Sequence, residues 1–260
     1  MSAADEAGTV SALRRGVAVL QCFGAGNASL SNAELSRLTG VPKPTVTRLA
    51  STLVALGLLR QDIATEKFSL GAGVLSLAHA FLSGFDIRAS ARPHLQRLAE
   101  ETGGTAYLAV RDAGEMVIID ACRARAPMLT MSLGIGSRVP LGTSSLGRAC
   151  LAGMPAGERE ALVGELGITG FDRVLHEADV HRYCTSLGEL RSEIHSLATS
   201  LCLPTGEVVS LNCGGPAFTF PESRLREEVG PRLLAAARTL ALEAGATLPL
   251  DNTFPQSKAA

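Results

Sequence analysis

The stretch from Pro42 to Gly57 constrains this chain more than any other part of the sequence. At about 100° per residue, apolar side chains fall on one side of a helix, at Val46, Leu49, Ala50, Leu53 and Leu56. The other side carries Thr47, Arg48, Ser51 and Thr52, with no carboxylate among them. Hydroxyls and a guanidinium suit the phosphates and base edges of a DNA major groove. Taken alone, the helix fits an ordinary solvated surface equally well.

A second short helix is predicted just before it, over residues 31–40. Ser31 is its cap, Glu34 completes a capping box, and Gly40 ends it. Val41 and Pro42 then force a tight, extended turn into the next helix. Two short helices joined by such a turn form a helix-turn-helix, whose second helix enters the groove.

The flanking segments complete a larger unit. Residues 10–23 predict a further helix that buries Leu13, Val17 and Leu20. Residues 58–61 and 68–70 predict two strands around a polar turn. Three helices followed by this hairpin indicate a winged helix-turn-helix.

Charge is distributed unevenly along the chain. The formal net charge of the 260 residues is −1, yet residues 11–85 hold seven Lys or Arg against three Asp or Glu. A basic first part joined to an acidic remainder is expected if only the first part meets DNA. Because the excess is small, we expect two or more copies to bind adjacent half-sites.

The rest of the chain predicts a sheet with helices packed on it. An apolar helix over residues 71–82 and an amphipathic helix from Asp86 to Gly103 precede it. Strands are then predicted at 105–111, 116–122, 128–133, 197–203 and 208–213, with a small-residue loop at 142–151 that leads into a helix. A final helix from Pro221 buries Leu225, Val229, Leu233 and Leu240. This is the α+β layout of a sensor domain with a pocket between sheet and helix.

Several motifs resemble those of the IclR family of bacterial transcriptional regulators. Four segments of this chain are similar to the DNA-binding domain of that family: LRRGVAVL from Leu13, AEL from Ala33, VPKPTVTRL from Val41 and FSLG from Phe68. Three further segments are similar to the GAF-like effector-binding domain of that family: RVPL from Arg138, LGRA from Leu146 and GGP from Gly214. Together the two resemblances span about residues 10 to 245. One departure is Pro44, where the family usually has Ser, so a hydroxyl and an N–H are missing there.

The resemblance implies five segments and a set of partners. The segments are a disordered tail at 1–9, a winged helix-turn-helix domain at 10–71, a linker helix at 72–85 that contributes to dimer packing, a GAF-like domain at 86–247, and a disordered tail at 248–260. The implied partners are double-stranded operator DNA, a small-molecule effector, which we expect to be an organic acid or aromatic catabolite, and further copies in a homodimer or homotetramer. No cofactor is implied.

We predict two groups of site residues. Those expected to read or clamp DNA are Lys43, Thr45, Thr47, Arg48, Ser51, Thr52 and Lys67. Those that the resemblance places in the effector pocket are Met131, Thr143, Ser144, Ser145, Leu146, His195, Ser196, Asn212 and Gly214. His195 and Ser196 are alternatives for one pocket position, and His195 is expected beside Asn212. An ordinary helix cap at residues 143–145 is as good a prediction as a ligand site.

Two other uses of this chain remain open. Cys202 or Cys213 with His195, oriented by Glu189 or Glu193, would suit a Cys/His enzyme. Cys202 and Cys213 on paired strands would suit a thiol sensor. The six cysteines form no C-x-x-C pair, and no H-E-x-x-H or phosphate-binding glycine loop occurs, so we predict neither catalysis nor a metal site.

No apolar run approaches the roughly 20 residues of a membrane span, and the N-terminus lacks a basic and then apolar signal. We therefore expect a cytoplasmic protein.

Overall fold

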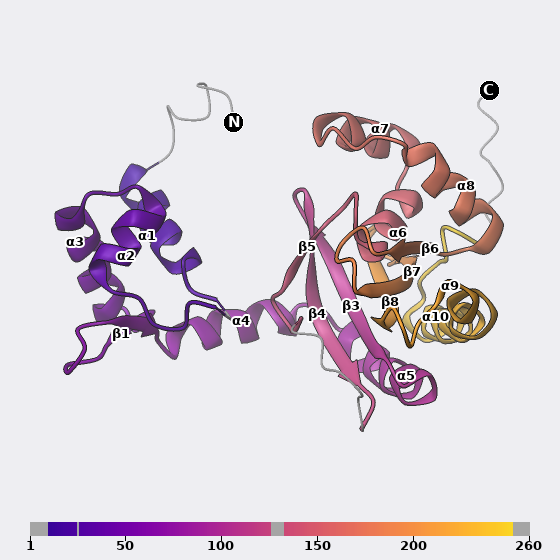
Figure 1. Ribbon diagram of the computed structural model, residues 1–260, viewed down its shortest axis with the longest axis horizontal. Coiled ribbons are helices and arrows are strands. Elements are labelled where there is room, and N and C mark those ends of the chain that lie inside the picture. Colours follow the sequence, from indigo (N-terminus) through magenta and orange to yellow (C-terminus); the bar gives the residue numbers. More distant parts are fainter. Residues whose placement is uncertain (1–9, 25, 126–132, 252–260) are drawn as a thin grey trace. The chain divides into compact units, whose positions relative to one another are not determined.

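The computed structural model describes residues 10–24, 26–125 and 133–251. They form two compact units, of which the first ends at Phe85 and the second begins at Asp86 (Figure 1). Three predictions concern residues outside these ranges: the tail at 1–9, most of the tail at 248–260, and most of the strand at 128–133. Within the described ranges, no helix is long and apolar enough to cross a membrane.

The first unit is a winged helix-turn-helix, as predicted. Its elements are α1 (Ser11–Gln21), α2 (Asn32–Thr39), α3 (Lys43–Ala55), β1 (Leu59–Gln61), β2 (Phe68–Leu70) and α4 (Gly73–Ser83). The capping box is confirmed, since Ser31 accepts from the backbone of Glu34 and the Glu34 carboxylate accepts from the backbone of Ser31. Gly40 adopts φ 69°, the left-handed conformation that ends a helix at low cost in a residue without Cβ.

The core of the first unit differs from prediction along α1. Val46, Ala50 and Leu53 of α3 are buried as expected, but Leu13 is 68% exposed and Val17 is 43% exposed. Instead, α1 turns Gly16 and Val19 inward. A Cβ on Gly16 would lie 4.0 Å from the side chain of Leu49, an ordinary van der Waals contact, so this side of α1 packs against α3. The apolar stripe of α1 therefore faces outward, and Leu56 at the end of α3 is also exposed.

The second unit is an antiparallel sheet with helices on both faces. In chain order its elements are α5 (Ile87–Thr102), β3 (Thr105–Asp112), β4 (Glu115–Arg123), β5 (Arg138–Pro140), α6 (Ser145–Gly153), α7 (Ala156–Glu165), α8 (Phe171–His181), β6 (Cys184–Leu187), β7 (Ile194–Cys202), β8 (Val208–Pro216), α9 (Glu222–Arg224), a π-helical turn (Leu225–Val229) and α10 (Gly230–Ala244). The strand order is β5-β4-β3-β8-β7-β6, and every pair is antiparallel.

The two faces of this sheet are covered by different helices (Figure 1). α5 and α10 pack together on one face, while α6 packs on the other, against β7 and β8, and contacts α8. Because side chains alternate along a strand, neighbouring residues of β7 or β8 point toward different helices. This alternation decides which polar residues meet beneath α6.

The final helix is not regular. Its predicted core residues Leu225, Val229, Leu233 and Leu240 are fully buried. However, Leu225–Val229 form a π-helical turn before α10. Pro231 lies in the first turn of α10 and has no N–H for an ordinary helical hydrogen bond, which accounts for the change in winding.

Candidate functional site

α3 presents a polar surface to solvent. Thr47, Arg48, Ser51 and Thr52 are all exposed, and Thr45 is half-buried. The hydroxyl of Thr47 donates to the carbonyl of Lys43 at 3.0 Å and accepts from the amide of Asn32 at 2.8 Å. Thr52 donates to the carbonyl of Arg48 at 3.0 Å. These bonds restrain the two threonine side chains.

The two predicted lysines lie on different elements. Lys43 is exposed at the start of α3, and Lys67 is half-buried where the wing re-enters β2. Lys67 also lies near Glu34, whose pKa is lowered chiefly by the backbone N–H of Ser31 and to a lesser degree by this lysine. At the wing tip, Asp62 accepts from the backbone and hydroxyl of Thr65, both at 2.8 Å.

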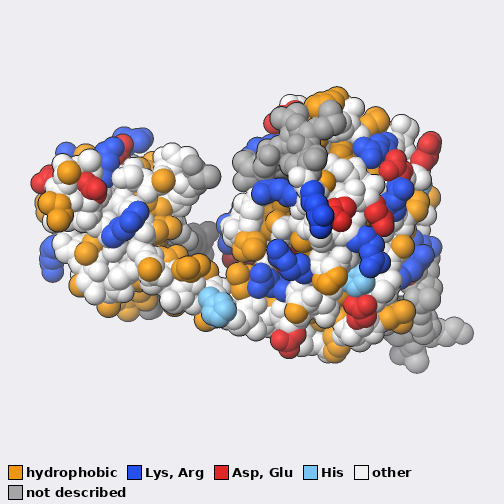
Figure 2. All heavy atoms as spheres, turned by 90° about the horizontal axis from the view of Figure 1, so that it is seen from below, with side chains coloured by type: hydrophobic (Ala, Val, Ile, Leu, Met, Phe, Trp, Pro, Cys, Tyr) orange, Lys and Arg blue, Asp and Glu red, His pale blue; other side chains and the backbone are white. Residues whose placement is uncertain are grey.

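Large apolar side chains are exposed elsewhere in the first unit. α4 buries none of its residues, and Leu75, Leu77 and Phe81 are each at least half exposed. A hollow of about 640 Å³ lies between α1 and α3. Leu13, Val17 and Leu56 line it together with Thr45, Arg48 and Thr52 of α3. Hydrophobic side chains are scattered over this unit in Figure 2. The hollow thus joins exposed apolar side chains of α1 to the polar side of α3.

The second unit holds a small pocket between α6 and the sheet. It encloses about 20 Å³, which is room for one water molecule. Its lining residues are Tyr107, Leu133, Val139, Ser144, Ser145, Leu146, Leu190, Ile194, Ser196, Asn212 and Gly214. Leu133, Leu190 and Ile194 are half-buried and form an apolar mouth, whereas Tyr107, Ser145 and Asn212 are buried.

A hydrogen-bonded cluster forms the polar floor of this pocket. Asn212 donates from Nδ2 to Ser145 Oγ at 2.7 Å, and Ser145 Oγ lies 2.9 Å from Ser196 Oγ. The three residues come from β8, α6 and β7. Ser196 is paired in register with Gly214, where a Cβ would overlap Ser196 and the carbonyl of His195. Glycine at position 214 therefore lets Ser196 reach the cluster.

The start of α6 completes the floor. Ser144 is its cap: its hydroxyl accepts from Gly147 N at 3.0 Å and donates to the carbonyl of Pro140 at 2.6 Å. The first turn of a helix directs unpaired N–H groups and a positive dipole outward, which favours an anion. Thr143 does not line the pocket, and its carbonyl accepts from Ser186. Met131 lies outside the described residues.

The predicted position of His195 beside Asn212 is wrong. His195 is next to Ser196 on β7, so the two side chains point to opposite faces of the sheet. The Nδ1 atom of His195 lies 3.0 Å from the carbonyl oxygen of Phe220. Of the two alternatives, Ser196 lines the pocket.

The structure does not assemble the Cys/His site that the alternative enzyme hypothesis requires. His195 bonds to a backbone carbonyl, while Cys213 Sγ lies 3.3 Å from Thr102 Oγ1. Glu189 forms an ion pair with Arg148 at 2.8 Å. Burial raises the pKa of Cys213 to about 11, so its thiol stays protonated at neutral pH and is a poor nucleophile.

The alternative of a thiol sensor requires Cys202 and Cys213 to lie close together, and the structure does not place them so. In the ladder between β7 and β8, Cys202 is paired with Val208, and Cys213 is paired with Leu197. Five residues along β7 separate these positions, or about 17 Å at the usual rise of a strand. Disulfide formation needs Cα atoms within roughly 7 Å, so these two thiols cannot form one in this fold.

Sequence analysis missed Tyr107 and the apolar mouth. Tyr107 is on β3, which pairs with β8 so that Tyr107 is directly opposite Asn212. The two residues are 105 positions apart in the chain, and only the strand order reveals that they meet. Leu190 and Ile194 lie in and after the connection from β6 to β7.

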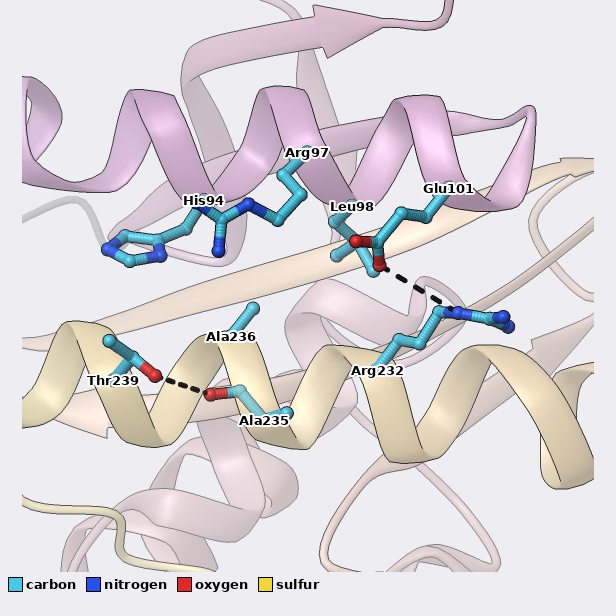
Figure 3. A pocket seen from close by; sticks show the side chains of 8 residues that line it. All are labelled: His94, Arg97, Leu98, Glu101, Arg232, Ala235, Ala236 and Thr239. Carbon is cyan, nitrogen blue, oxygen red and sulfur yellow. Dashed lines mark hydrogen bonds and ion pairs between the residues drawn. The ribbon is translucent and has the colours of Figure 1, made fainter.

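A further hollow, of about 190 Å³, lies between α5 and α10 (Figure 3). Two of its polar side chains form ion pairs with neighbouring residues. Glu101 lies 3.8 Å from Arg232, and His94 lies 2.9 Å from Glu243. In residues 10–24, 26–125 and 133–251, no three His, Cys, Asp or Glu side chains gather to hold a metal ion.

Comparison with known proteins identifies the family. The IclR helix-turn-helix domain matches residues 12–62, and the bacterial transcriptional regulator IclR C-terminal domain matches residues 79–242. The chain belongs to the IclR family. The resemblance seen in its motifs and the predicted α+β fold class are both confirmed.

Individual relatives agree with this assignment. The HTH-type transcriptional regulator TsaQ1/TsaQ2 of Comamonas testosteroni is 30% identical over 96% of this chain and 94% of that protein. The crystal structure of an IclR family transcriptional regulator from Brucella abortus is 39% identical, with a TM-score of 0.78 over 90% of this chain and 92% of that one. These relatives are named as regulators, not enzymes.

A more distant neighbour carries a ligand. It is an IclR homolog from Microbacterium hydrocarbonoxydans complexed with 4-hydroxybenzoate, 21% identical, with a TM-score of 0.68 over 88% of this chain and 100% of that one. At this identity the likeness concerns the fold alone.

Proposed function

We propose that this IclR-type chain is a one-component regulator that acts in the cytoplasm as a dimer or tetramer. Its first unit binds operator DNA, and its second unit binds a small organic acid or aromatic catabolite that modulates this binding. The observation that carries the proposal is the exposed surface of α3, with Thr47, Arg48, Ser51 and Thr52 and no acid among them.

On DNA, α3 lies in the major groove in this proposal. Arg48 contacts a base edge or a phosphate, and the threonine and serine hydroxyls contact phosphates or base edges beside it. Lys43 at the start of α3 and Lys67 in the wing contact the flanking phosphates. Pro44 has neither a hydroxyl nor an N–H and makes no such bond.

Exposed apolar surface supports an assembly of several copies. α4 has no buried residue in the single chain, and Leu75, Leu77 and Phe81 would be covered in a dimer. A dimer also brings two copies of α3 to one duplex, which doubles the small number of phosphate contacts that one copy provides.

The pocket beneath α6 supports an acidic ligand. Its floor consists of hydroxyls, an amide and a helix start, and no carboxylate lines it among the described residues. Such a floor favours anions. The ligand named for the Microbacterium homolog, 4-hydroxybenzoate, is an acid of this class.

Regulation follows from linkage between the two sites. A ligand alters DNA affinity only by as much as it prefers one arrangement of the assembled chains over another. The same coupling requires that operator DNA change the affinity for the ligand by an equal factor.

Selection of random duplexes by the full-length chain tests the DNA-binding proposal. We expect an enriched motif with two-fold symmetry, whose half-sites are separated by whole helical turns. Sedimentation velocity of the selected complex should then give two or four chains per duplex. A selection without an enriched motif, or a complex with one chain, would contradict the proposal.

A further inference from the structure

The connection from β6 to β7 lies at the mouth of the pocket. It comprises residues 188–193, and Leu190 within it lines the pocket together with Ile194 at the start of β7. Both side chains are half-buried, and Leu190 packs against the hydrophobic core of the second unit. With this connection in place, the pocket encloses only about 20 Å³. A ligand larger than a water molecule therefore needs part of the mouth to move.

The two ends of this connection are well defined. The carbonyl of Glu193 accepts from the backbone N–H of Ala217 at 2.8 Å, which fixes the end nearer β7. At the other end, Gly188 adopts φ 101°, a conformation that is open to glycine because it lacks a Cβ. A Cβ at Gly188 would lie 3.5 Å from the backbone of Ser192, so the ends of residues 188–192 lie close together. A short loop closed on itself beside a glycine is suited to turn as a unit.

One ion pair holds residues 188–192 to the body of the second unit. Glu189 Oε1 accepts from Arg148 Nη1 of α6 at 2.8 Å. The other carboxylate oxygen of Glu189 accepts from the backbone N–H of Leu187, at the end of β6. Within the described part of the chain, no other hydrogen bond or ion pair joins residues 188–192 to a helix. Loss of the pair with Arg148 would leave the packing of Leu190 as their main attachment.

The two partners of this ion pair are held very differently. The guanidinium of Arg148 also donates to the carbonyl of Gly142 at 3.0 Å and to the carbonyl of Thr185 at 2.7 Å. Its side chain is 13% exposed, whereas that of Glu189 is 43% exposed. Both residues line an open hollow of about 730 Å³ beside α8, so water reaches the pair. The carboxylate can therefore leave into water, while two carbonyls still satisfy the arginine.

We propose that residues 188–192 form a lid over the pocket, and that the Glu189–Arg148 ion pair is the latch that holds the lid closed. When the latch opens, the connection turns about Gly188, and Leu190 leaves the mouth. The lid thus controls access to the pocket for whatever ligand binds there. This inference rests on the proposed function, because it concerns the regulation of the same ligand site.

Labelling of a thiol placed in the pocket of the full-length chain measures access. Ser196→Cys puts the thiol on the pocket floor, beside Ser145. Methyl methanethiosulfonate transfers a methylthio group to this thiol and releases methanesulfinate, and mass spectrometry of peptide fragments separates the site from the six native cysteines. Adding Glu189→Gln, which keeps the shape of the side chain and removes its charge, should raise the labelling rate about fivefold, the value of one partly exposed ion pair.

Glu193→Gln is the matched control. Glu193 is in the same connection, and its carboxylate accepts from the adjacent Ser192 rather than from α6. This substitution should leave the labelling rate unchanged. Amide hydrogen exchange of residues 187–194 gives a second readout in chains that keep Ser196. Glu189→Gln should raise this exchange about fivefold over the wild type, and Glu193→Gln should not.

Three results would overturn the inference. The first is an equal labelling rate with and without Glu189→Gln, and the second is an equal acceleration by Glu193→Gln. The third is faster exchange in Glu189→Gln without faster labelling, since the connection would then move without opening the pocket. If Ser196→Cys fails to fold, hydrogen exchange decides alone, and equal exchange in Glu189→Gln and the wild type overturns the lid.

These measurements use neither a ligand nor DNA. Their failure therefore overturns the lid and leaves the proposed function intact. Failure of the duplex selection would overturn the DNA-binding proposal and leave the lid intact, so the two failures are distinguishable.

Discussion

The exposed face of α3 and the pocket beneath α6 both use hydroxyl side chains, but these side chains differ in their bonding partners. On α3, Thr47 and Thr52 bond mainly to carbonyls of their own helix. In the pocket, Ser145, Ser196 and Asn212 bond to one another across a helix and two strands. Within the first site, the only described bond to another element is the one from Asn32 of α2 to Thr47, whereas the second site depends on the packing of several elements. A substitution on the exposed face of α3 should therefore disturb few neighbouring residues, whereas a substitution in the pocket should disturb residues on several elements.

The largest effect is expected from Gly147→Val, in α6. A Cβ at this position would overlap the backbone of Leu141, which cannot move aside without displacing α6. We expect a loss of about 3 kcal/mol in the free energy of unfolding of the second unit, and a decrease of roughly 6–12 °C in its melting temperature. Scanning calorimetry of the full-length chain measures both quantities.

Gly157→Ala, in α7, is the matched control. No atom lies within 4 Å of a Cβ built there, so the alanine should be neutral or stabilising. Equal melting temperatures for the two variants would show that the packing of α6 does not hold the second unit together.

Arg48→Ala should have the next largest effect, and it should act on DNA alone. Loss of a guanidinium from the groove should weaken operator binding by about 2 kcal/mol, or roughly 30-fold. Ligand affinity should stay unchanged, because Arg48 is in the first unit. A gel-shift titration measures the change, with the exposed residue Arg97 of α5, as Arg97→Ala, for comparison. Equal operator affinity of the two variants would remove Arg48 from the interface.

Asn212→Leu should have the converse effect. It removes the amide that bonds to Ser145, so the affinity for an acidic ligand should fall by about 1.5 kcal/mol, or roughly tenfold. Operator affinity of the unliganded chain should match the wild type. Calorimetric titration and a gel shift on the same preparation test both parts, and an operator affinity that falls with ligand affinity would contradict the separation of the two sites.

Local sequence rules predicted the first unit well because its determinants are local. The capping box at Ser31 and Glu34 and the end of α2 at Gly40 depend on residues a few positions apart. The failure at α1 has a different origin. Periodicity marked Leu13 and Val17 as a stripe, but it could not show whether that stripe faces α3 or the solvent. The burial of Gly16 and Val19 shows that the opposite side of α1 faces the core.

The pocket was only partly predictable because strand order brings it together. Ser144, Ser145 and Asn212, which the family motifs assign to one site, line the same pocket. The orientation of His195 depends on the pleat of β7, and a shift of one residue reverses it. Tyr107 depends on β3 being the neighbour of β8, a contact between residues far apart in the chain that no local pattern encodes.

The smallest effect is expected from Ser210→Ala. The sign of the change in the free energy of unfolding should distinguish a buried hydroxyl without a partner from the paired hydroxyls of the pocket. The Ser210 side chain is fully buried, and its hydroxyl has no hydrogen-bond partner among the described residues. Alanine removes that unpaired group and leaves little space behind, so the free energy of unfolding should rise by about 1 kcal/mol. Ser145→Ala should lower it by a similar amount, because it leaves Asn212 without its acceptor. Chemical denaturation of both variants measures the difference. If both substitutions destabilise the protein equally, then Ser210 has a partner of its own, and polar groups beneath α6 are paired beyond the pocket as well as within it.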